Sequence, residues 1–267
     1  MLLTAKGDKM LYTENIEKNL LEAKEVRKKL NKVEGVVVGK KRNPPMGLYL
    51  LNYANLLMDR QIDIFDDAIL LLDNKRYQAA CIISRGMIET HAFSRLLNNS
   101  VEKILRNHTG LESVDKALDV ILKFTNSSRF KKIEQTKIKD GIFNPDDYMF
   151  TEQAKYRFEN FLAASQHVAE ALRKMYEEEK AQTQHKESQF EITYDALSEY
   201  VHPSQISIFN YYTPDIHLTP TSFGDIHTYD SARFLCARAL HFIVDAENQH
   251  HWSTLLAQEM TNRSVMN

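Results

Sequence analysis

Apolar residues recur every three or four positions over most of this chain, and residues that end helices are rare. Residues 46–73 show the pattern most clearly, with an apolar stripe at Leu50, Tyr53, Leu57, Ile64, Ala68 and Leu71. This spacing places the apolar side chains on one face of an α-helix. The 267 residues include only 8 glycines and 6 prolines, too few for a fold built from many turns. The sequence therefore predicts an all-α protein, folded as a single helical bundle.

Turn signals divide the chain into its expected elements. We expect helices at residues 13–34, 46–73, 76–98, 111–123, 151–182, 190–202 and 229–260. Asp73, Asn74 and Lys75 leave room only for a tight turn, so the helices on either side of it should be antiparallel neighbours. Residues 36–38 are a candidate for a short strand. The irregular segment 205–228 is predicted to be a loop that crosses the bundle before the last long helix.

Residues 1–45 are predicted to form an N-terminal amphipathic helical arm, and residues 46–267 to form the bundle domain. Residues 1–42 contain 11 Lys and Arg against 6 Asp and Glu, a local excess of five positive charges. A solvated helix face is the simpler interpretation, because charged helix faces are common. The other interpretation is an arm that packs on a partner chain or an anionic ligand.

Global charge and hydropathy bound the environment of the protein. The 34 Lys and Arg against 36 Asp and Glu give a formal net charge of −2, which argues against a broad basic field that coats nucleic acid. No apolar run approaches the roughly 20 residues that a bilayer span needs. We therefore expect a cytoplasmic protein without membrane contact. Cys81 and Cys236 lie in apolar helical patterns, where buried thiols are expected rather than a disulfide.

Arg85 and Glu89 are the first candidate site residues. They lie four residues apart in the least charged predicted helix, and so on the same face of it. Burying either charge alone is costly, so we expect the two to pair or to meet partners from another helix. A structural i,i+4 ion pair is one interpretation, and a polar pocket inside the bundle is the other.

A second polar row ends the helix predicted before the crossing loop. Tyr194, Ser198 and His202 are spaced four residues apart and should project from one face. A proline follows His202 and limits the helix there, and an imidazole at a helix C-terminus is suited to proton transfer or anion binding. The alternative is that His202 caps carbonyl groups and that Ser204 begins a turn.

The two rows would form a composite site if Arg85 and Glu89 faced Ser198 and His202 from a neighbouring helix. In a ribonuclease, His202 would act as general base on a 2′-hydroxyl group, and Arg85 would stabilise the phosphate charge. In a binding protein, the same groups would hold a phosphate or nucleotide without cleaving it. In a structural protein, they would form an internal polar network that fixes the helix register.

Two parts of the sequence together resemble a known group of proteins. They are YQAA at 77–80 followed by RGMIE at 85–89, and SEYVHPS at 198–204. In combination they resemble an uncharacterised bacterial family of helical domains, similar to the HEPN superfamily (higher eukaryotes and prokaryotes nucleotide-binding domains), over about residues 50–255. The resemblance implies a metal-independent ribonuclease or RNA-binding protein, plausible in phage-defence or toxin–antitoxin systems. It also implies a site that a homodimer assembles from an Arg and a His separated by four to six residues.

Arg85 and His91 have the spacing that this resemblance implies. Six positions along a continuous helix rotate His91 by about 240° from Arg85, so the two side chains converge only if the helix breaks at Gly86. The predicted catalytic residues are Arg85, Glu89, Ser198 and His202, and the predicted binding residues are Tyr194, Ser204 and His91. RNA or a nucleotide is the expected ligand, and a second copy or another protein the expected partner. The alternative function is a non-catalytic helical scaffold that assembles with itself or with a partner protein.

Two Glu-x-x-His patterns raise the question of a metal site. Glu199 with His202, and Glu247 with His250, match the motif that di-iron bundles use twice. That scheme needs a further Glu between the two patterns, and residues 203–246 contain none. We therefore predict neither a metal site nor a cofactor.

Overall fold

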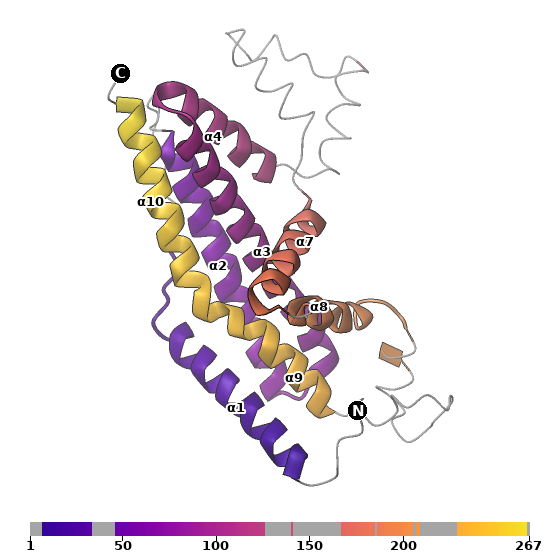
Figure 1. Ribbon diagram of the computed structural model, residues 1–267. Coiled ribbons are helices and arrows are strands. Elements are labelled where there is room, and N and C mark those ends of the chain that lie inside the picture. Colours follow the sequence, from indigo (N-terminus) through magenta and orange to yellow (C-terminus); the bar gives the residue numbers. More distant parts are fainter. Residues whose placement is uncertain are drawn as a thin grey trace. The chain divides into compact units, whose positions relative to one another are not determined.

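A computed structural model describes residues 7–33, 46–125, 140, 167–184, 186–204, 207–208 and 229–265. Every regular element among these residues is a helix, which confirms the predicted all-α fold. The α-helices are α1 (Gly7–Arg27), α2 (Gly47–Asp73), α3 (Tyr77–Asn107), α4 (Gly110–Thr125), α7 (Val168–Thr183), α8 (Gln189–Glu199), α9 (Tyr229–Leu240) and α10 (Ala246–Val265). A 3₁₀-helix, η4 (His241–Asp245), joins α9 to α10 (Figure 1). None of these helices combines the length and apolar character that crossing a membrane requires.

Most of the predicted helices are found close to their expected bounds. The helices predicted at 46–73 and 111–123 are α2 and α4, whereas α3 continues well past its predicted end at residue 98. Of the helix predicted at 151–182, the structure describes the second half as α7, and residues 151–166 lie outside the described residues. The candidate strand at 36–38 and most of the predicted loop at 205–228 also lie outside them.

The first helix ends earlier than predicted, at Arg27. The Arg27 guanidinium donates to Leu30 O at 2.9 Å and to the two carboxylate oxygens of Asp66 on α2 at 2.8 and 2.6 Å. The Val33 N–H donates to Asp59 Oδ1, also on α2, at 3.0 Å. These bonds replace those of a continuing helix, so the segment after Arg27 follows α2 as a non-helical connection.

Basic residues of the N-terminal segment face acidic residues of α2. Besides the Arg27 pair, Lys24 Nζ lies 3.8 Å from Asp73 Oδ1, and Lys32 pairs with Asp63. Part of the local positive excess is thus compensated within the chain. These contacts favour a segment that packs on its own chain.

Contacts within the chain divide it into two compact units. Unit 1 takes Met1–Val33, Leu57–Ala92 and Lys174–Asn248, and unit 2 takes Glu34–Leu56, Phe93–Arg173 and Gln249–Asn267. The helix α1 belongs to unit 1. The expected division into an arm at 1–45 and a bundle domain at 46–267 stays a prediction.

In unit 1, α1 packs against α9 and η4, and α8 packs against α9 (Figure 1). The tight turn predicted between α2 and α3 is present: Lys75 has a φ of 57°, and the Asn74 side chain donates to Leu70 O at 2.8 Å. A left-handed residue just past a helix end is a common way to reverse the chain. The fully buried side chains of this unit include Ile16, Ile62, Phe65, Met87, Ile88, Leu197, Leu240 and Ile243.

In unit 2, α10 lies against the beginning of α2. A Cβ atom on Gly47 would stand 1.9 Å from Ala257 O, so only glycine permits this close approach. Near the C-terminal end of α10, Arg263 Nη1 donates to His108 O at 2.8 Å. This bond ties α10 to the turn between α3 and α4.

Candidate functional site

Arg85 and Glu89 form the expected ion pair on one face of α3. Arg85 Nη2 lies 3.0 Å from Glu89 Oε1, and the two side chains are 28% and 25% exposed. Tyr194 of α8 joins them, since its hydroxyl donates to Glu89 Oε1 at 2.8 Å and accepts from Arg85 Nη2. Arg85 Cζ also lies 4.7 Å from the centre of the Tyr194 ring, within cation–π range. A closed polar triangle therefore links α3 to α8.

The start of α8 is fixed by a side-chain cap. Ser188 Oγ accepts from the Glu191 N–H at 3.0 Å. Glu179 of α7 accepts from the Phe190 N–H at 3.2 Å and from the Ser188 hydroxyl. Two N–H groups that a helix start leaves unpaired are thus satisfied. The cap fixes the residue at which α8 begins beside α7. It therefore also determines which residue of α8 reaches Arg85.

Tyr176 of α7 is a fourth polar group beside the triangle. It is 8% exposed, and its hydroxyl has no hydrogen-bond partner among the described residues. Burial raises its pKa far above the ordinary value, and Tyr194 and nearby carboxylates raise it further. Burial also raises the pKa of Tyr194, against the opposing effect of its bond from Arg85.

We refer to these four residues, Arg85, Glu89, Tyr176 and Tyr194, as the Arg85 cluster. Besides the Tyr176 hydroxyl, Arg85 Nε is buried without a hydrogen-bond partner in the described part of the chain. Buried polar atoms without partners are rare in folded proteins and call for an explanation. One side of the Arg85 guanidinium is therefore paired within the cluster. Two donors of the cluster, Arg85 Nε and the Tyr176 hydroxyl, have no acceptor among the described residues.

The surroundings of the cluster on α8 are acidic. Burial raises the pKa of the Asp195 carboxyl, and the charges of Glu191 and Glu199 add to this effect. Lys180 compensates one of them, because its Nζ lies 2.9 Å from Glu191 Oε2. This side of α8 consequently favours a cation or a neutral group over an anion.

Ser198 lies one turn beyond Tyr194 on α8, as its spacing requires, and it is turned to its own helix. Its Oγ donates to Tyr194 O at 2.8 Å. Within the described residues no hydrogen bond or ion pair connects Ser198 to Arg85 or Glu89. The predicted contact of Ser198 with the Arg85–Glu89 pair is thus not formed.

His202 is placed differently from the prediction, because α8 ends at Glu199. The Ser204 hydroxyl donates to Glu199 O at 3.0 Å, and the Ser207 hydroxyl donates to His202 O. These bonds to carbonyl groups close a turn after α8. His202 consequently lies beyond the helix, with an exposed side chain that forms no hydrogen bond or ion pair with a described residue. Ser204 closes this turn and begins the next one, since its carbonyl oxygen accepts from the Ile208 N–H at 3.0 Å. The other part of the alternative, that the His202 side chain caps carbonyl groups, is not found among the described residues.

His91 does not converge with Arg85, since α3 continues without a break through Gly86. A Cβ atom on Gly86 would meet a side-chain carbon of α2 at 3.3 Å, so this glycine serves helix packing. The His91 ring is 3% exposed, with its centroid 4.4 Å from that of Phe242. Its Nε2 lies 3.9 Å from Asp245 Oδ2. His91 therefore belongs to the packing of α3 against η4.

The remaining candidates for site chemistry are the thiols and possible metal ligands. Cys81 and Cys236 are free and fully buried, with their sulfur atoms 3.7 Å apart, which confirms the prediction of buried thiols. The hydrogen bond with Cys236, together with burial, raises the pKa of the Cys81 thiol.

The described histidines, cysteines and carboxylates form no group of three or more placed to hold a metal ion.

Tyr176 is the one member of the Arg85 cluster that sequence reasoning missed. It lies in α7 beside Leu172 and Met175, which are both buried. A tyrosine in an apolar stripe must bring a hydroxyl into the interior, and that hydroxyl usually needs a partner. This pattern was a usable signal for a polar group in the core.

The Arg85 cluster lies within the part of the chain that defines its family. The model described as "Family of unknown function (DUF5677)" matches residues 51–215, more than half of the chain. The protein is therefore a member of this family of helical proteins. Comparison with curated proteins gave no match, and comparison with solved structures gave none.

Proposed function

We propose that this protein is a non-catalytic helical scaffold that assembles with a second copy of itself. The observation that carries the proposal is the closed triangle of Arg85, Glu89 and Tyr194. Its charges and hydroxyl meet partners inside the chain, so they need no substrate to compensate them. In this function the triangle holds α8 on α3.

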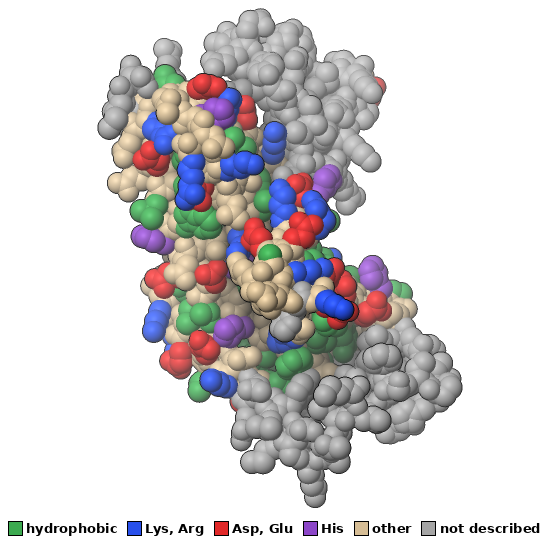
Figure 2. Space-filling view, viewed as in Figure 1, with side chains coloured by type: hydrophobic (Ala, Val, Ile, Leu, Met, Phe, Trp, Pro, Cys, Tyr) green, Lys and Arg blue, Asp and Glu red, His purple; other side chains and the backbone are tan. Residues whose placement is uncertain are grey.

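The distribution of charge supports a protein partner over a polyanion. Figure 2 shows Lys and Arg side chains interspersed with Asp and Glu over the visible face of the described residues. The whole chain has a formal net charge of −2, and the α8 side of the cluster is acidic. Binding to RNA depends mainly on neutralising phosphates with basic side chains, which this arrangement does not favour.

Exposed apolar side chains of α2 supply a surface for self-assembly. Tyr49 and Leu56 are 42% and 58% exposed. They lie seven residues apart and therefore on one face of α2, in the spacing through which helices pair. A second copy that presents the same row would cover both side chains in a two-fold contact.

Light scattering after size-exclusion chromatography tests this assembly. We expect a particle of about twice 31.0 kDa for the wild type, and a monomer for Leu56→Glu, which places a charge in the contact. Leu111→Glu is the matched control, because Leu111 of α4 is 49% exposed and its variant should remain dimeric. A wild-type monomer at every concentration, or a dimeric Leu56→Glu protein, would contradict the proposal.

One observation favours a second function, the RNA binding or metal-independent RNA cleavage that the resemblance to the HEPN superfamily implies. Such a function would belong to a defence or toxin–antitoxin system. The Arg85 Nε–H and the Tyr176 hydroxyl are buried donors for which the described residues supply no acceptor, and a phosphate oxygen could serve as one. His91 and His202 lie apart from Arg85 within the described chain. Cleavage would therefore require a histidine other than these two, for which a second copy is the source that the resemblance implies.

RNA assays in the presence of a chelator distinguish the two functions. The scaffold proposal expects no cleavage of mixed RNA and no salt-sensitive change in fluorescence anisotropy. The HEPN-like function expects cleavage or binding that Arg85→Ala abolishes while the circular dichroism spectrum is retained. His202→Ala then separates catalysis from binding, since a base is needed only for cleavage. RNA cleavage or binding by the wild type would replace the scaffold proposal.

A further inference from the structure

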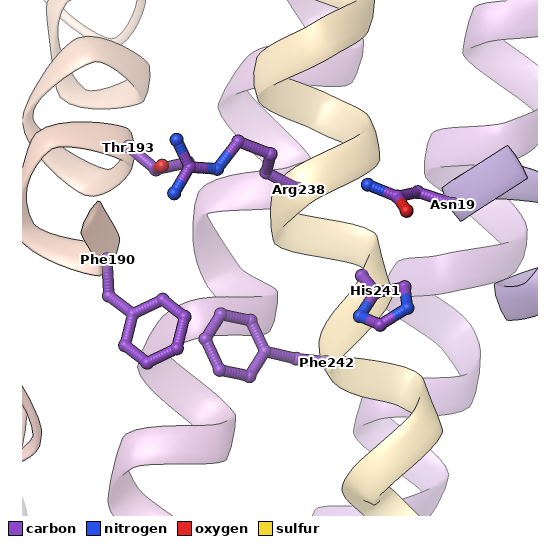
Figure 3. Close-up of a pocket in the computed structure, with 6 residues that line it drawn as sticks. All are labelled: Asn19, Phe190, Thr193, Arg238, His241 and Phe242. Carbon is purple, nitrogen blue, oxygen red and sulfur yellow. The ribbon is translucent and has the colours of Figure 1, made fainter. Parts of the chain in front are cut away.

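A cavity in unit 1 shares no lining residue with the Arg85 cluster. Its volume is about 150 Å³. The residues that line it come from α1, α8, α9 and η4 and are Asn19, Phe190, Thr193, Arg238, His241 and Phe242 (Figure 3). Because α1 packs on α9 and η4, and α8 packs on α9, contacts within one unit hold the walls of the cavity in place.

The two basic residues of the lining already have partners within the chain. The Arg238 guanidinium donates to the side-chain and main-chain oxygens of Gln189, both at 3.2 Å. Its Cζ also lies 5.5 Å from the centre of the Phe234 ring. His241 Nε2 lies 3.1 Å from Glu22 Oε2. A ligand therefore does not have to supply a charge to either residue, and a neutral ligand avoids the cost of burying an ionic group.

One wall of the cavity consists of two phenylalanine rings. Phe190 of α8 and Phe242 of η4 have their ring centroids 4.9 Å apart and their planes inclined by 55°. Figure 3 shows the two side chains turned toward each other. The Phe242 ring also contacts the buried His91 ring, at 4.4 Å between centroids. Since Phe242 is held by both neighbours, this wall is preformed, and a further aromatic ring can pack against it.

Two neutral polar residues complete the lining. Figure 3 shows the Asn19 amide extending from α1 toward α9, and this amide forms no hydrogen bond with a described residue. An amide supplies both donors and an acceptor. Thr193 of α8 is 2% exposed, and its hydroxyl donates to Gln189 O at 2.7 Å, so its oxygen can still accept a hydrogen bond. These groups suit a ligand with a hydroxyl group, which both donates and accepts.

We propose that this cavity binds a small, neutral, single-ring aromatic ligand that carries a hydroxyl group, that is, a phenol. The ring would pack against Phe190 and Phe242, and the hydroxyl group would bond to the Asn19 amide. The volume limits the ligand to this size, because a cavity of about 150 Å³ accommodates one benzene ring, whereas sites for drug-sized ligands measure about 300–1,000 Å³. This site is independent of both functions proposed above.

Isothermal titration calorimetry with phenol itself tests the proposal on the full chain. We expect saturable binding with one phenol per chain. Toluene has the ring without the hydroxyl group, and cyclohexanol has the hydroxyl group without a flat ring. Each should bind about three- to tenfold more weakly than phenol, as expected for the loss of one favourable contact. No saturable heat with phenol, or equal affinity for all three compounds, would overturn the proposal.

Variants of two lining residues locate the binding and assign the contacts. Asn19→Ala should weaken the binding of phenol about three- to tenfold and leave that of toluene unchanged, because only phenol loses a hydrogen bond. Alanine is the better helix former, so this variant should keep α1 intact. Phe190→Leu should weaken the binding of both compounds, since it removes part of the aromatic wall.

Asn248→Ala is the matched control for Asn19→Ala. Asn248 is an exposed asparagine of unit 1 that donates to Asp245 at 3.1 Å and does not line the cavity, so its variant should retain the wild-type affinity for phenol. Circular dichroism checks that each variant is folded. Unchanged phenol affinity in a folded Asn19→Ala or Phe190→Leu protein, or weakened binding in Asn248→Ala, would contradict the assignment.

Discussion

A polar cluster in unit 1 can be compared with one in unit 2, and the two differ in charge and in completeness. In unit 2, the Asn98 amide donates to Gln249 O and Oε1 at 3.0 and 3.3 Å, and the Ser253 hydroxyl donates to Asn98 Oδ1 at 2.6 Å. These three side chains are neutral and less than a tenth exposed. In unit 1, the Arg85 cluster is charged, and its ion pair is about a quarter exposed. Two of its buried polar atoms have no partner among the described residues.

The difference separates two uses of buried polarity. Neutral amides and hydroxyls that are paired with one another can be buried at little cost and fix the register of the helices that carry them. Charged groups keep some access to water because full burial is costly. The polar atoms of the Arg85 cluster that lack a partner among the described residues could form a further hydrogen bond. The unit 2 network is therefore expected to contribute more to stability than the Arg85 cluster.

The largest expected effect comes from breaking the neutral network. Asn98→Leu removes the amide donor to Gln249 and the Oδ1 acceptor of the Ser253 hydroxyl, whose other hydrogen bond, to Gln249 O at 3.0 Å, remains possible. We expect it to lower the free energy of unfolding by about 2–4 kcal/mol, measured by urea denaturation. Asn107→Leu, at an exposed position near the end of the same helix, should change it by less than about 0.5 kcal/mol. A similar small change for both variants would remove the distinction between the clusters.

Breaking the charged cluster should cost less. Arg85→Ala leaves Glu89 partly buried without its cation, and we expect a loss of about 1–3 kcal/mol, reduced from that of a fully buried pair by the exposure of both side chains. Arg106→Ala is the matched control on α3, since Arg106 pairs with Glu102 in the same i,i+4 geometry but is 74% exposed. Its expected loss is about 0–0.5 kcal/mol. Equal melting temperatures for the two variants would show that the Arg85 cluster does not stabilise the fold.

Alkaline pH should weaken unit 1 through its two cluster tyrosines, whose pKa values are raised. A phenol with a raised pKa in the folded state keeps its proton where the unfolded chain has lost it. Stability is therefore unaffected below the unfolded value of about 10 and falls above it, by up to about 1.4 kcal/mol per pH unit for each tyrosine. Urea denaturation from about pH 8 to pH 11 measures this decline, and Tyr176→Phe should make it shallower. An unchanged slope in that variant would contradict the expected titration.

The smallest expected effects come from removing one hydroxyl at a time. Tyr194→Phe removes the donor to Glu89 and should lower the free energy of unfolding by about 1 kcal/mol. Tyr176→Phe removes a buried hydroxyl that has no partner within the described part of the chain, so stability should stay unchanged or rise by up to about 1 kcal/mol. Thermal melts of both variants measure the difference. Equal losses would mean that the Tyr176 hydroxyl is satisfied in solution.

The parts of the site that could be predicted from the sequence are those that one helix determines. Arg85 and Glu89 share a face because the α-helical repeat alone places them there. The position of His202 could not be derived in this way. In a continuing helix Glu199 O would accept from the N–H of residue 203, which is proline and has none, and the Ser204 hydroxyl donates to it instead, while the Ser207 hydroxyl donates to His202 O. Side chains of this kind favour turns over helix, and their effect depends on how the chain continues.

The amino-acid sequence by itself determined that the chain is helical and where α2 turns into α3. It also determined that both cysteines are buried in helices. These features depend on interactions between residues a few positions apart, or on the apolar character of a short stretch. Only the tertiary structure decided that Tyr194, and not His202, meets Arg85 across 109 positions of sequence, and that Tyr176 lies beside them. Contacts over such separations depend on how whole helices pack, and no local pattern encodes which face of α8 meets α3.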